Sequence, residues 1–296
     1  MISIITPINK FPDSFHLTVN SILAQKGEYE WIIVVNGFLK SEEISNYLYK
    51  FKNFESKKNK FLKKVRILSS PGDGVSSARN YGVSMSSGKY VLFLDADDYI
   101  SPNFLVSVED FICSNSFVNA ICVPGKEFNL NKSNHVNIMR PANLIRKNGL
   151  LPDQILLANG IRTPSGFIIK KSLFYIFDER VAFLEDYLMF ITLFSKNVPF
   201  YAFNTVCYYY FSDEKPSDRV KRYGIKKIES GIDHVLSSDA FSSLSFQNKF
   251  RIRTFLSIIY SKYAYKRMRI LFHYFVLFLI SPVAGYEMIV KKIRRN

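Results

Sequence analysis

The chain has 296 residues, of which 48% are hydrophobic, so it can form one large domain, or a domain with an appendage, around a core that needs no disulfide bonds. Its three cysteines are odd in number and lack metal-ligand spacing, which argues against a disulfide-rich secreted protein and predicts reduced, inert thiols. The net charge is +15, and the segment from Lys249 to the end supplies +10 of it through eleven Lys and Arg and one acid. Met1 runs directly into apolar residues without a basic leader, which predicts a cytoplasmic protein.

In chain order, the first hundred residues alternate strand patterns with helical patterns. Strands are expected at 2–6, 31–35, 65–68 and 90–94, with helices from Asp13, as a cap, to about 25 and over 75–86. Apolar strands separated by helices predict an α/β fold with a mostly parallel sheet between helices. Ligands of such sheets bind at the carboxyl ends of the strands. These ends are expected at Thr6–Pro7, Asn36–Gly37, Pro71–Gly74 and from Asp95 onward.

Three carboxylates stand within four residues directly after the strand 90–94, at Asp95, Asp97 and Asp98. Crowded carboxylates repel one another unless a cation lies between them. Mg²⁺ and Mn²⁺ suit oxygen ligands and commonly bind substrate phosphates beside one or two protein carboxylates. The cluster therefore indicates a divalent metal site, and the alternative is a turn or a helix cap before Pro102.

An ordered set of short segments resembles the family-2 glycosyltransferases, which have the GT-A fold. The segments are 3–7, 19–25, 31–35, 74–82, 88–98, 167–171 and 184–187. The resemblance covers roughly residues 1–200 and implies a Rossmann-like catalytic domain over 1–210. Residues 1–100 would form its nucleotide-binding half and 101–210 its acceptor half. Residues 211–296, largely beyond the resemblance, are expected to form a helical, basic C-terminal extension.

The resemblance assigns roles in donor binding to five positions. Thr6 and Pro7 would lie against the nucleotide base, and Arg79 near the base or the diphosphate. Asp95 would contact the ribose or the sugar, and Asp97 would coordinate Mg²⁺ or Mn²⁺ at the diphosphate. The alternative reading of Arg79 is a surface residue of its helix.

The chain departs from the family pattern after the second strand. Family members commonly carry an aspartate pair there, and one carboxylate accepts the N3–H group of uracil. This chain has Asn36 followed by Gly37. The amide oxygen of Asn36 still accepts a hydrogen bond, without charge assistance. A UDP-sugar donor is therefore expected, and another base stays open.

Asp186, in the sequence Leu184-Glu185-Asp186, resembles the general base of the family. An inverting transfer needs one carboxylate within hydrogen-bond reach of the acceptor hydroxyl. Because neighbours on a helix point about 100° apart, only one of the two acids can face the reaction centre. Glu185 is then expected to orient the acceptor or to support the site. Alternatively, both are first-turn acids that the helix dipole favours.

The basic C-terminal region contains an apolar run over 270–280, flanked by Lys and Arg. Eleven apolar residues are too few to span a bilayer, which needs about 20. The run predicts an interfacial helix at an anionic membrane surface, and the alternative is packing against the enzyme body. Membrane contact would bring the enzyme to lipid-linked acceptors at the inner face of the cytoplasmic membrane.

Together these features predict an inverting, metal-dependent glycosyltransferase that transfers a sugar from a nucleotide-sugar donor to a glycan or glycolipid acceptor of a bacterial surface polysaccharide. One alternative is a GT-A module that binds a nucleotide sugar without turnover. Another is a nucleic-acid-binding protein led by the basic tail. Nothing in residues 1–200 supports that reading, so nucleic acid is not expected as a partner.

Overall fold

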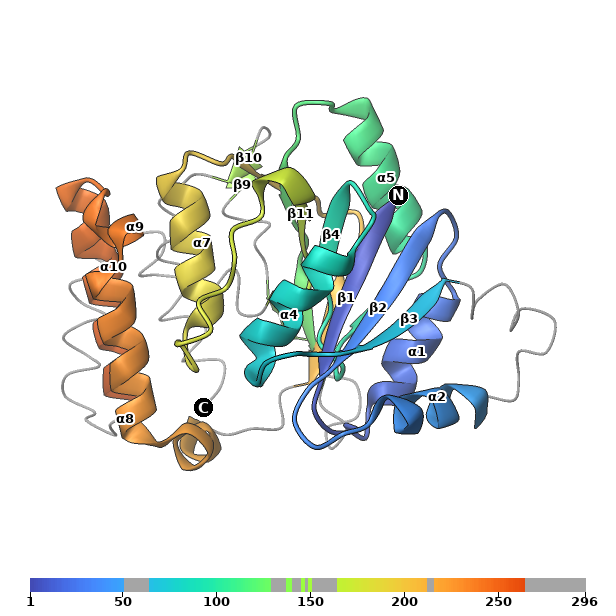
Figure 1. The fold of residues 1–296 in the computed structure, drawn as a ribbon. Helices are drawn as coiled ribbons and strands as arrows, with labels where there is room; N and C mark the ends of the chain where they lie inside the picture. Colours follow the sequence, from blue (N-terminus) through green and yellow to red (C-terminus); the bar gives the residue numbers. More distant parts are fainter. Residues whose placement is uncertain are drawn as a thin grey trace.

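The computed structural model describes residues 1–50, 64–128, 137–139, 145–146, 149–150, 164–211 and 216–263. Its centre is a seven-stranded sheet with the order β12-β6-β11-β4-β1-β2-β3 (Figure 1). The strands are β1 (Ile2–Ile8), β2 (Tyr29–Val35), β3 (Val65–Ser69), β4 (Tyr90–Phe93), β6 (Ala120–Cys122), β11 (Phe167–Lys170) and β12 (Phe200–Ala202). β11 is antiparallel to both of its neighbours, and every other pair in this sheet is parallel. The prediction of a mostly parallel sheet is confirmed.

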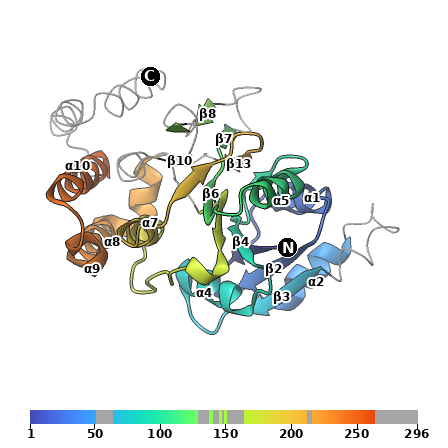
Figure 2. The ribbon, with the colours of Figure 1, turned by 90° about the horizontal axis from the view of Figure 1, so that it is seen from above.

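Helices cover both faces of the sheet, as the view from above shows (Figure 2). One face packs against α1 (Phe15–Leu23), α2 (Ser41–Lys50) and α5 (Phe104–Ser114), and the other against α4 (Gly74–Met85) and α7 (Glu185–Ser195). Successive strand residues point to opposite faces. In β1, Ile4 therefore contributes to the first cluster and Ile5 to the second, and both are fully buried.

Several predicted boundaries differ from the structure by one or two residues, and two of these differences involve Pro7 and Asp13. β1 was expected to end at Pro7 but continues to Ile8. The carbonyl oxygen of Ile8 accepts a hydrogen bond from the N–H group of Asn36, so the backbone polar groups of Ile8 face β2. Because this direction alternates along a strand, the backbone polar groups of Pro7 face β4. Pairing with β4 has already ended at Ile5, and the missing N–H group of Pro7 therefore breaks no ladder bond. The first helix begins after Ser14, so the prediction of Asp13 as its cap is wrong.

A smaller sheet stands at the carboxyl edge of the main sheet, with the order β5-β13-β7-β8. Its strands are β5 (Tyr99–Ile100), β7 (Gly125–Phe128), β8 (Asn137–Met139) and β13 (Tyr208–Phe211), and a two-stranded sheet joins β9 (Ile145–Arg146) and β10 (Gly149–Leu150). Three main-sheet strands, β4, β6 and β12, lead directly into β5, β7 and β13. Since these three point the same way, the small sheet lies where ligands of an α/β sheet bind.

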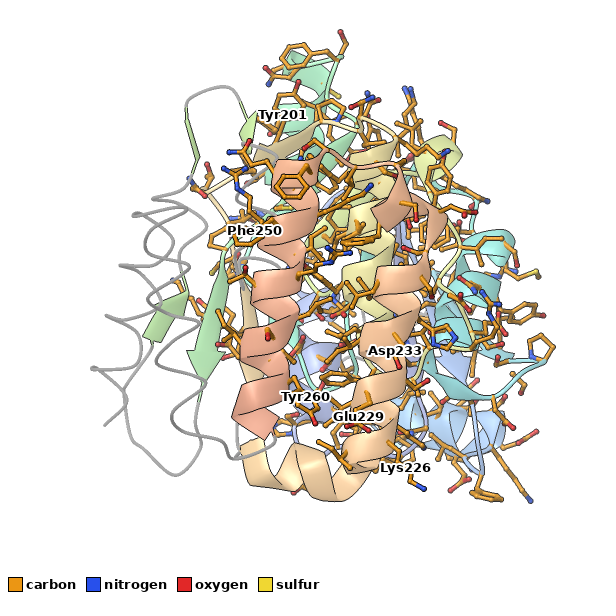
Figure 3. The ribbon with its side chains drawn as sticks, turned by 90° about the vertical axis from the view of Figure 1, so that its left-hand side faces the viewer. Tyr201, Lys226, Glu229, Asp233, Phe250 and Tyr260 are labelled. Carbon is orange, nitrogen blue, oxygen red and sulfur yellow. The ribbon has the colours of Figure 1, made fainter. Side chains whose placement is uncertain are left out.

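The last described elements are α8 (Pro216–Ser237), α9 (Asp239–Ser242) and α10 (Phe246–Tyr263), as the predicted helical extension requires. Their apolar residues form a third cluster with α7, which thus packs against the sheet on one side and these helices on the other. Figure 3 shows Glu229 of α8 beside Tyr260 of α10, whose hydroxyl donates to it at 3.1 Å.

Within the described part of the chain, no helix has the length and apolar character needed to cross a membrane. The predicted interfacial run, 270–280, lies outside the described residues. The division into a catalytic domain over 1–210 and a C-terminal region over 211–296 stays a prediction.

Candidate active site

An open cleft of about 250 Å³ lies at the carboxyl ends of β1 and β2. Its lining comes from the end of β1, from the loops after β1 and β2 and from the start of α4, and consists of Pro7, Ile8, Asn9, Asn36, Gly37, Asp73, Gly74 and Val75. Gly74 adopts φ +86°, and no atom lies within 4 Å of the place where a Cβ would stand. Bare backbone therefore forms this part of the cleft, so a ligand can approach it closely.

Asn36 combines deep burial with an unsatisfied polar group. The side chain is 7% exposed, and its Oδ1 has no hydrogen-bond partner among the described residues. A buried polar atom without a partner costs free energy, so such an atom in a cleft wall points to a ligand group that completes it. The position fits the predicted contact with a nucleotide base, which itself stays a prediction.

Thr6 and Pro7, the other two residues predicted to lie against the base, have different places. Pro7 lines the cleft, whereas Thr6 is fully buried and is not part of the lining. The Oγ1 of Thr6 accepts a hydrogen bond from Nε1 of Trp31 at 2.9 Å. Thr6 thus shapes the end of β1 from within the core.

The acidic loop after β4 is held from one side by α1. Ser14 Oγ donates to the carbonyl oxygen of Asp97 at 3.2 Å, and Thr18 Oγ1 donates to that of Ala96 at 2.8 Å. Ser14 is the residue directly before α1, and Thr18 lies within that helix. These two bonds fix the backbone of the loop, and the side chain of Asp97 is exposed at its tip.

Ser165 holds the same loop from the other side. Its Oγ accepts from the N–H group of Asp95 at 2.9 Å, and its hydroxyl also bonds to the carboxyl of Asp98. Asp98 is 4% exposed, and burial, followed by the charges of Asp97 and Asp95, raises its pKa well above the ordinary value. Asp98 is therefore a buried anchor beneath the loop whose charged form is disfavoured, whereas Asp95 is half-buried and Asp97 is exposed.

Arg79 lies beneath the carboxylates and joins two of them. Its Nη2 donates to Asp95 Oδ1 at 2.9 Å and its Nη1 to Glu185 Oε1 at 3.2 Å, and the side chain is 3% exposed. Burial alone would lower the pKa of the guanidinium, but the charges of Asp95 and Glu185 raise it above its ordinary value. Arg79 is thus charged, and the reading as a surface residue of its helix is wrong. Its predicted contact with the base or the diphosphate stays a prediction.

Glu185 and Asp186 lie in the first turn of α7, after Leu184, whose backbone is left-handed with φ +70°. Burial raises the pKa of Glu185, and the nearby Arg79 opposes that shift. Burial, and after it the charge of Glu185, raises the pKa of Asp186 to about 7. A carboxyl that titrates near neutral pH is suited to general acid–base work.

The residues present fit a hard divalent ion that takes few ligands from the protein and most of its other ligands from a bound substrate and water. Among the described residues no group of three His, Cys, Asp or Glu is placed to hold a metal. Asp95 is committed to Arg79 and Asp98 is buried, which leaves Asp97 as the exposed carboxylate of the loop. Mg²⁺ typically takes one or two carboxylates and completes its shell with phosphates and water. Metal binding by Asp97 stays a prediction.

Sequence reasoning missed two residues that support the site, namely Ser165 and Thr18. Ser165 stands two residues before the predicted segment 167–171, and Thr18 interrupts an apolar helix face. A polar residue at such a place is a weak signal. Their partners lie far away in the chain, with separations of 70 and 78 residues.

The family model described as Glycosyl transferase family 2 matches residues 3–177. The minor teichoic acid biosynthesis protein GgaA of Bacillus subtilis (strain 168) is 34% identical over 130 residues, which cover 42% of this chain and 27% of that protein. The poly(ribitol-phosphate) beta-N-acetylglucosaminyltransferase TarP of Staphylococcus aureus (strain N315) is 28% identical over 113 residues, covering 37% of this chain and 32% of that protein. The matches thus span about a quarter to a third of these relatives.

The fold is similar to that of S. aureus TarS 1-349, with a TM-score of 0.59 and 17% identity over 90% of this chain and 73% of that one. The same protein has been solved in complex with UDP-GlcNAc. At this identity the likeness concerns the fold alone. The family model, in contrast, runs through β1, β2 and β4, whose ends carry the cleft and the acidic loop. The chain therefore belongs to glycosyl transferase family 2.

Proposed function

We propose that this chain is an inverting, metal-dependent glycosyltransferase that moves a sugar from a UDP-sugar to a hydroxyl group of a glycan or glycolipid acceptor. The observation that supports this most directly is the ion-pair network of Arg79. It joins Asp95, the predicted donor-binding carboxylate, to Glu185, the neighbour of Asp186. The predicted donor contact and the predicted base thereby belong to one electrostatic unit, in which the charge of Asp95 also acts on Asp186.

On the donor side, the base of the nucleotide would occupy the cleft beside Asn36 and Pro7 and supply the missing partner of Asn36 Oδ1. Asp95 would accept hydrogen bonds from the ribose or the sugar. Asp97 would hold Mg²⁺ or Mn²⁺ at the diphosphate, where such an ion stabilises negative charge on the leaving group. Support for UDP comes from the fold neighbour TarS, which has been solved with UDP-GlcNAc.

On the acceptor side, Asp186 would take the proton of the attacking hydroxyl while its oxygen approaches the anomeric carbon from the face opposite the nucleotide. Its pKa of about 7 suits this role, because a base works best when its pKa lies near the working pH. Glu185, held by Arg79, would keep the start of α7 in place.

The named relatives support a bacterial surface polymer as the acceptor. One is described as a teichoic acid biosynthesis protein and another as a poly(ribitol-phosphate) N-acetylglucosaminyltransferase. We infer further that the C-terminal region contacts an anionic membrane surface. Phe246 and Phe250 of α10 are 83% and 42% exposed, and Lys249 and Arg253 stand close to them in the sequence.

The experiment that tests the proposal incubates the full chain with a panel of UDP-, CDP-, GDP- and dTDP-sugars, with Mg²⁺, Mn²⁺ or EDTA. Release of nucleoside diphosphate and transfer to teichoic-acid and glycolipid acceptors are measured. Turnover of one UDP-sugar that is lost in Asp186→Asn is the expected result. The rival, a module without turnover, predicts UDP binding but no release in either protein. Activity that survives both EDTA and Asp97→Ala would remove the metal from the proposal.

A further inference from the structure

Arg79 and Asn80 are consecutive residues of α4, and both reach the segment that leads into α7. We call residues 177–184 the lead-in segment. Arg79 makes the ion pairs already described with Asp95 and Glu185, at 2.9 and 3.2 Å. The centre of its guanidinium also stands 5.3 Å from the ring centroid of Phe177 at the start of the lead-in segment.

Asn80 binds the same segment through its whole amide group. Its Nδ2 donates to the carbonyl oxygen of Phe177 at 2.9 Å, and its Oδ1 accepts from the N–H group of Phe177 at 2.9 Å. Nδ2 also lies 3.0 Å from Glu179 Oε1. An amide that both donates to and accepts from one residue fixes its backbone in position and orientation.

The lead-in segment ends in a conformation that needs outside support. Leu184 has φ +70°, a left-handed backbone that a leucine adopts only at a cost in free energy. Glu185 and Asp186 follow at once, so the direction of both carboxylates depends on this turn. Anchors before the turn, at Phe177, and after it, at Glu185, hold it from both sides.

We infer that Arg79 and Asn80 act together as positioning residues, a bracket that fixes the start of α7 against the acidic loop and so places Asp186 relative to the donor. This inference rests on the proposed function. It assigns Arg79 the task of joining the donor half to the acceptor half of the site, in place of a contact with the diphosphate. A guanidinium has the planar fork that can pair two carboxylates at once, whereas a lysine ammonium is a single point charge.

The test compares Arg79→Lys, Asn80→Ala and the wild type. Each protein is titrated with UDP and Mg²⁺ by calorimetry, and turnover of the UDP-sugar found in the panel is measured per UDP-binding site. Arg79→Lys keeps the positive charge beside Asp95 but loses the fork. Because misplacement of a catalytic group by about 1 Å costs about 100-fold in rate, we expect kcat to fall about 10- to 100-fold in Arg79→Lys and about 10-fold in Asn80→Ala. The Kd for UDP should change by less than about 3-fold in both.

Ser84→Ala is the matched control on the same helix, since the exposed Ser84 bonds only within α4, to the carbonyl oxygen of Tyr81. Its kcat and Kd should equal those of the wild type. Normalisation to UDP-binding sites separates loss of positioning from loss of folded protein. A double-mutant cycle of Arg79→Lys with Glu185→Gln adds a second readout. Because both changes break the same ion pair, the double variant should lose little more kcat than the more severe single variant.

Two results would overturn the bracket while leaving the proposed function intact. In the first, kcat stays within about two-fold of the wild type in both variants. In the second, the Kd for UDP weakens more than about 10-fold in Arg79→Lys, as a diphosphate ligand requires. A wild type that turns over no nucleotide sugar would overturn the proposed function and the bracket with it.

Discussion

Asp186 and Glu185 share the first turn of α7, where burial makes the charged form of each carboxyl costly. At a pH below the pKa of Asp186, about 7, the carboxyl is protonated and cannot act as a base. We expect kcat/KM to fall about ten-fold for each pH unit below about 6 and to level off above about 8. A pH–rate profile of the wild type checks this. A profile that is flat from pH 5 to pH 8 would contradict the role of Asp186.

The same carboxyl affects stability with a definite sign. Its pKa is raised in the folded protein, so the folded state binds a proton more tightly than the unfolded chain. The stability of the wild type should therefore decrease as pH rises from about 4 through about 7. Asp186→Asn, which keeps the acceptor for the N–H group of Tyr187, should be more stable than the wild type by up to about 4 kcal/mol at pH 8 and about equal to it at pH 4. Denaturant unfolding at the two pH values measures the difference.

Replacing Asn36 by an apolar residue should affect protein stability and UDP affinity in opposite directions. Asn36→Leu removes a buried oxygen that has no partner among the described residues, so stability should stay equal or rise by about 1 kcal/mol. Affinity for UDP should fall about ten-fold or more, because the acceptor for the base is gone. Calorimetry with UDP and thermal unfolding measure the two effects. Asn36→Asp keeps an acceptor and should retain UDP binding, whereas unchanged affinity in Asn36→Leu would place the base elsewhere.

Residue type and order were enough to single out the acidic loop, because a run such as Asp95-Ala96-Asp97-Asp98 after an apolar strand has few structural uses. Partners across the fold were not accessible in this way. Arg79 stands on a helix next to a Gly-rich loop, and no local pattern shows that it lies beneath Glu185, 106 residues later. The resemblance alone pointed to Asp186, whose raised pKa arises from burial that only the packed helices provide.

At the scale of elements, α8 approaches the active site through its backbone. A Cβ on Gly231 would stand 2.2 Å from the carbonyl oxygen of Phe183, two residues before Glu185. Because that neighbour is backbone, it cannot rotate away. A glycine at this position therefore allows the C-terminal helices to support the turn that carries the proposed base, Asp186.

Gly231→Ala should push α8 away from Phe183 and disturb the start of α7. We expect a loss of about 1–3 kcal/mol in stability and a fall in kcat, with the Kd for UDP unchanged because neither Gly231 nor Phe183 lines the cleft. Ser230→Ala, an exposed neighbour on the same helix, is the control. Full activity and stability of Gly231→Ala would show that α8 is not pressed against this turn.

The first four strands and the helices α1 and α4 could be predicted from apolar periodicity, whereas α2 was not predicted. Their ends depended on local bonds that the pattern does not contain. β1 continues through Pro7 because no hydrogen bond to β4 requires a backbone N–H group there. The residue that precedes α1 is Ser14 and not Asp13. The small sheet could not be foreseen, because strands such as β5 are only two residues long and their partners lie far along the chain.

At the scale of the whole molecule, positive charge is concentrated toward the C-terminus, with +10 of +15 from Lys249 onward. Basic residues near an anionic bilayer contribute about 1 kcal/mol each, and the effect decreases with salt. The full chain should therefore float with vesicles that contain anionic lipid and not with neutral vesicles, and about 0.5 M salt should weaken the binding strongly. The double variant Phe246→Ser/Phe250→Ser tests how much these aromatic side chains contribute to vesicle binding. Equal binding to neutral vesicles, or tighter salt-sensitive binding to RNA, would contradict the membrane proposal.

Trp31 is the single tryptophan of the sequence, its ring is 0% exposed, and it donates a hydrogen bond to Thr6. Thr6 is followed by Pro7 in the wall of the cleft. The unlabelled protein thus carries a single tryptophan fluorophore, which is hydrogen-bonded to the residue next to the proposed nucleotide site. Its emission should lie at short wavelength, change in intensity when UDP enters the cleft, and shift to long wavelength on unfolding. Intrinsic fluorescence would then report both occupancy of the site and integrity of the sheet.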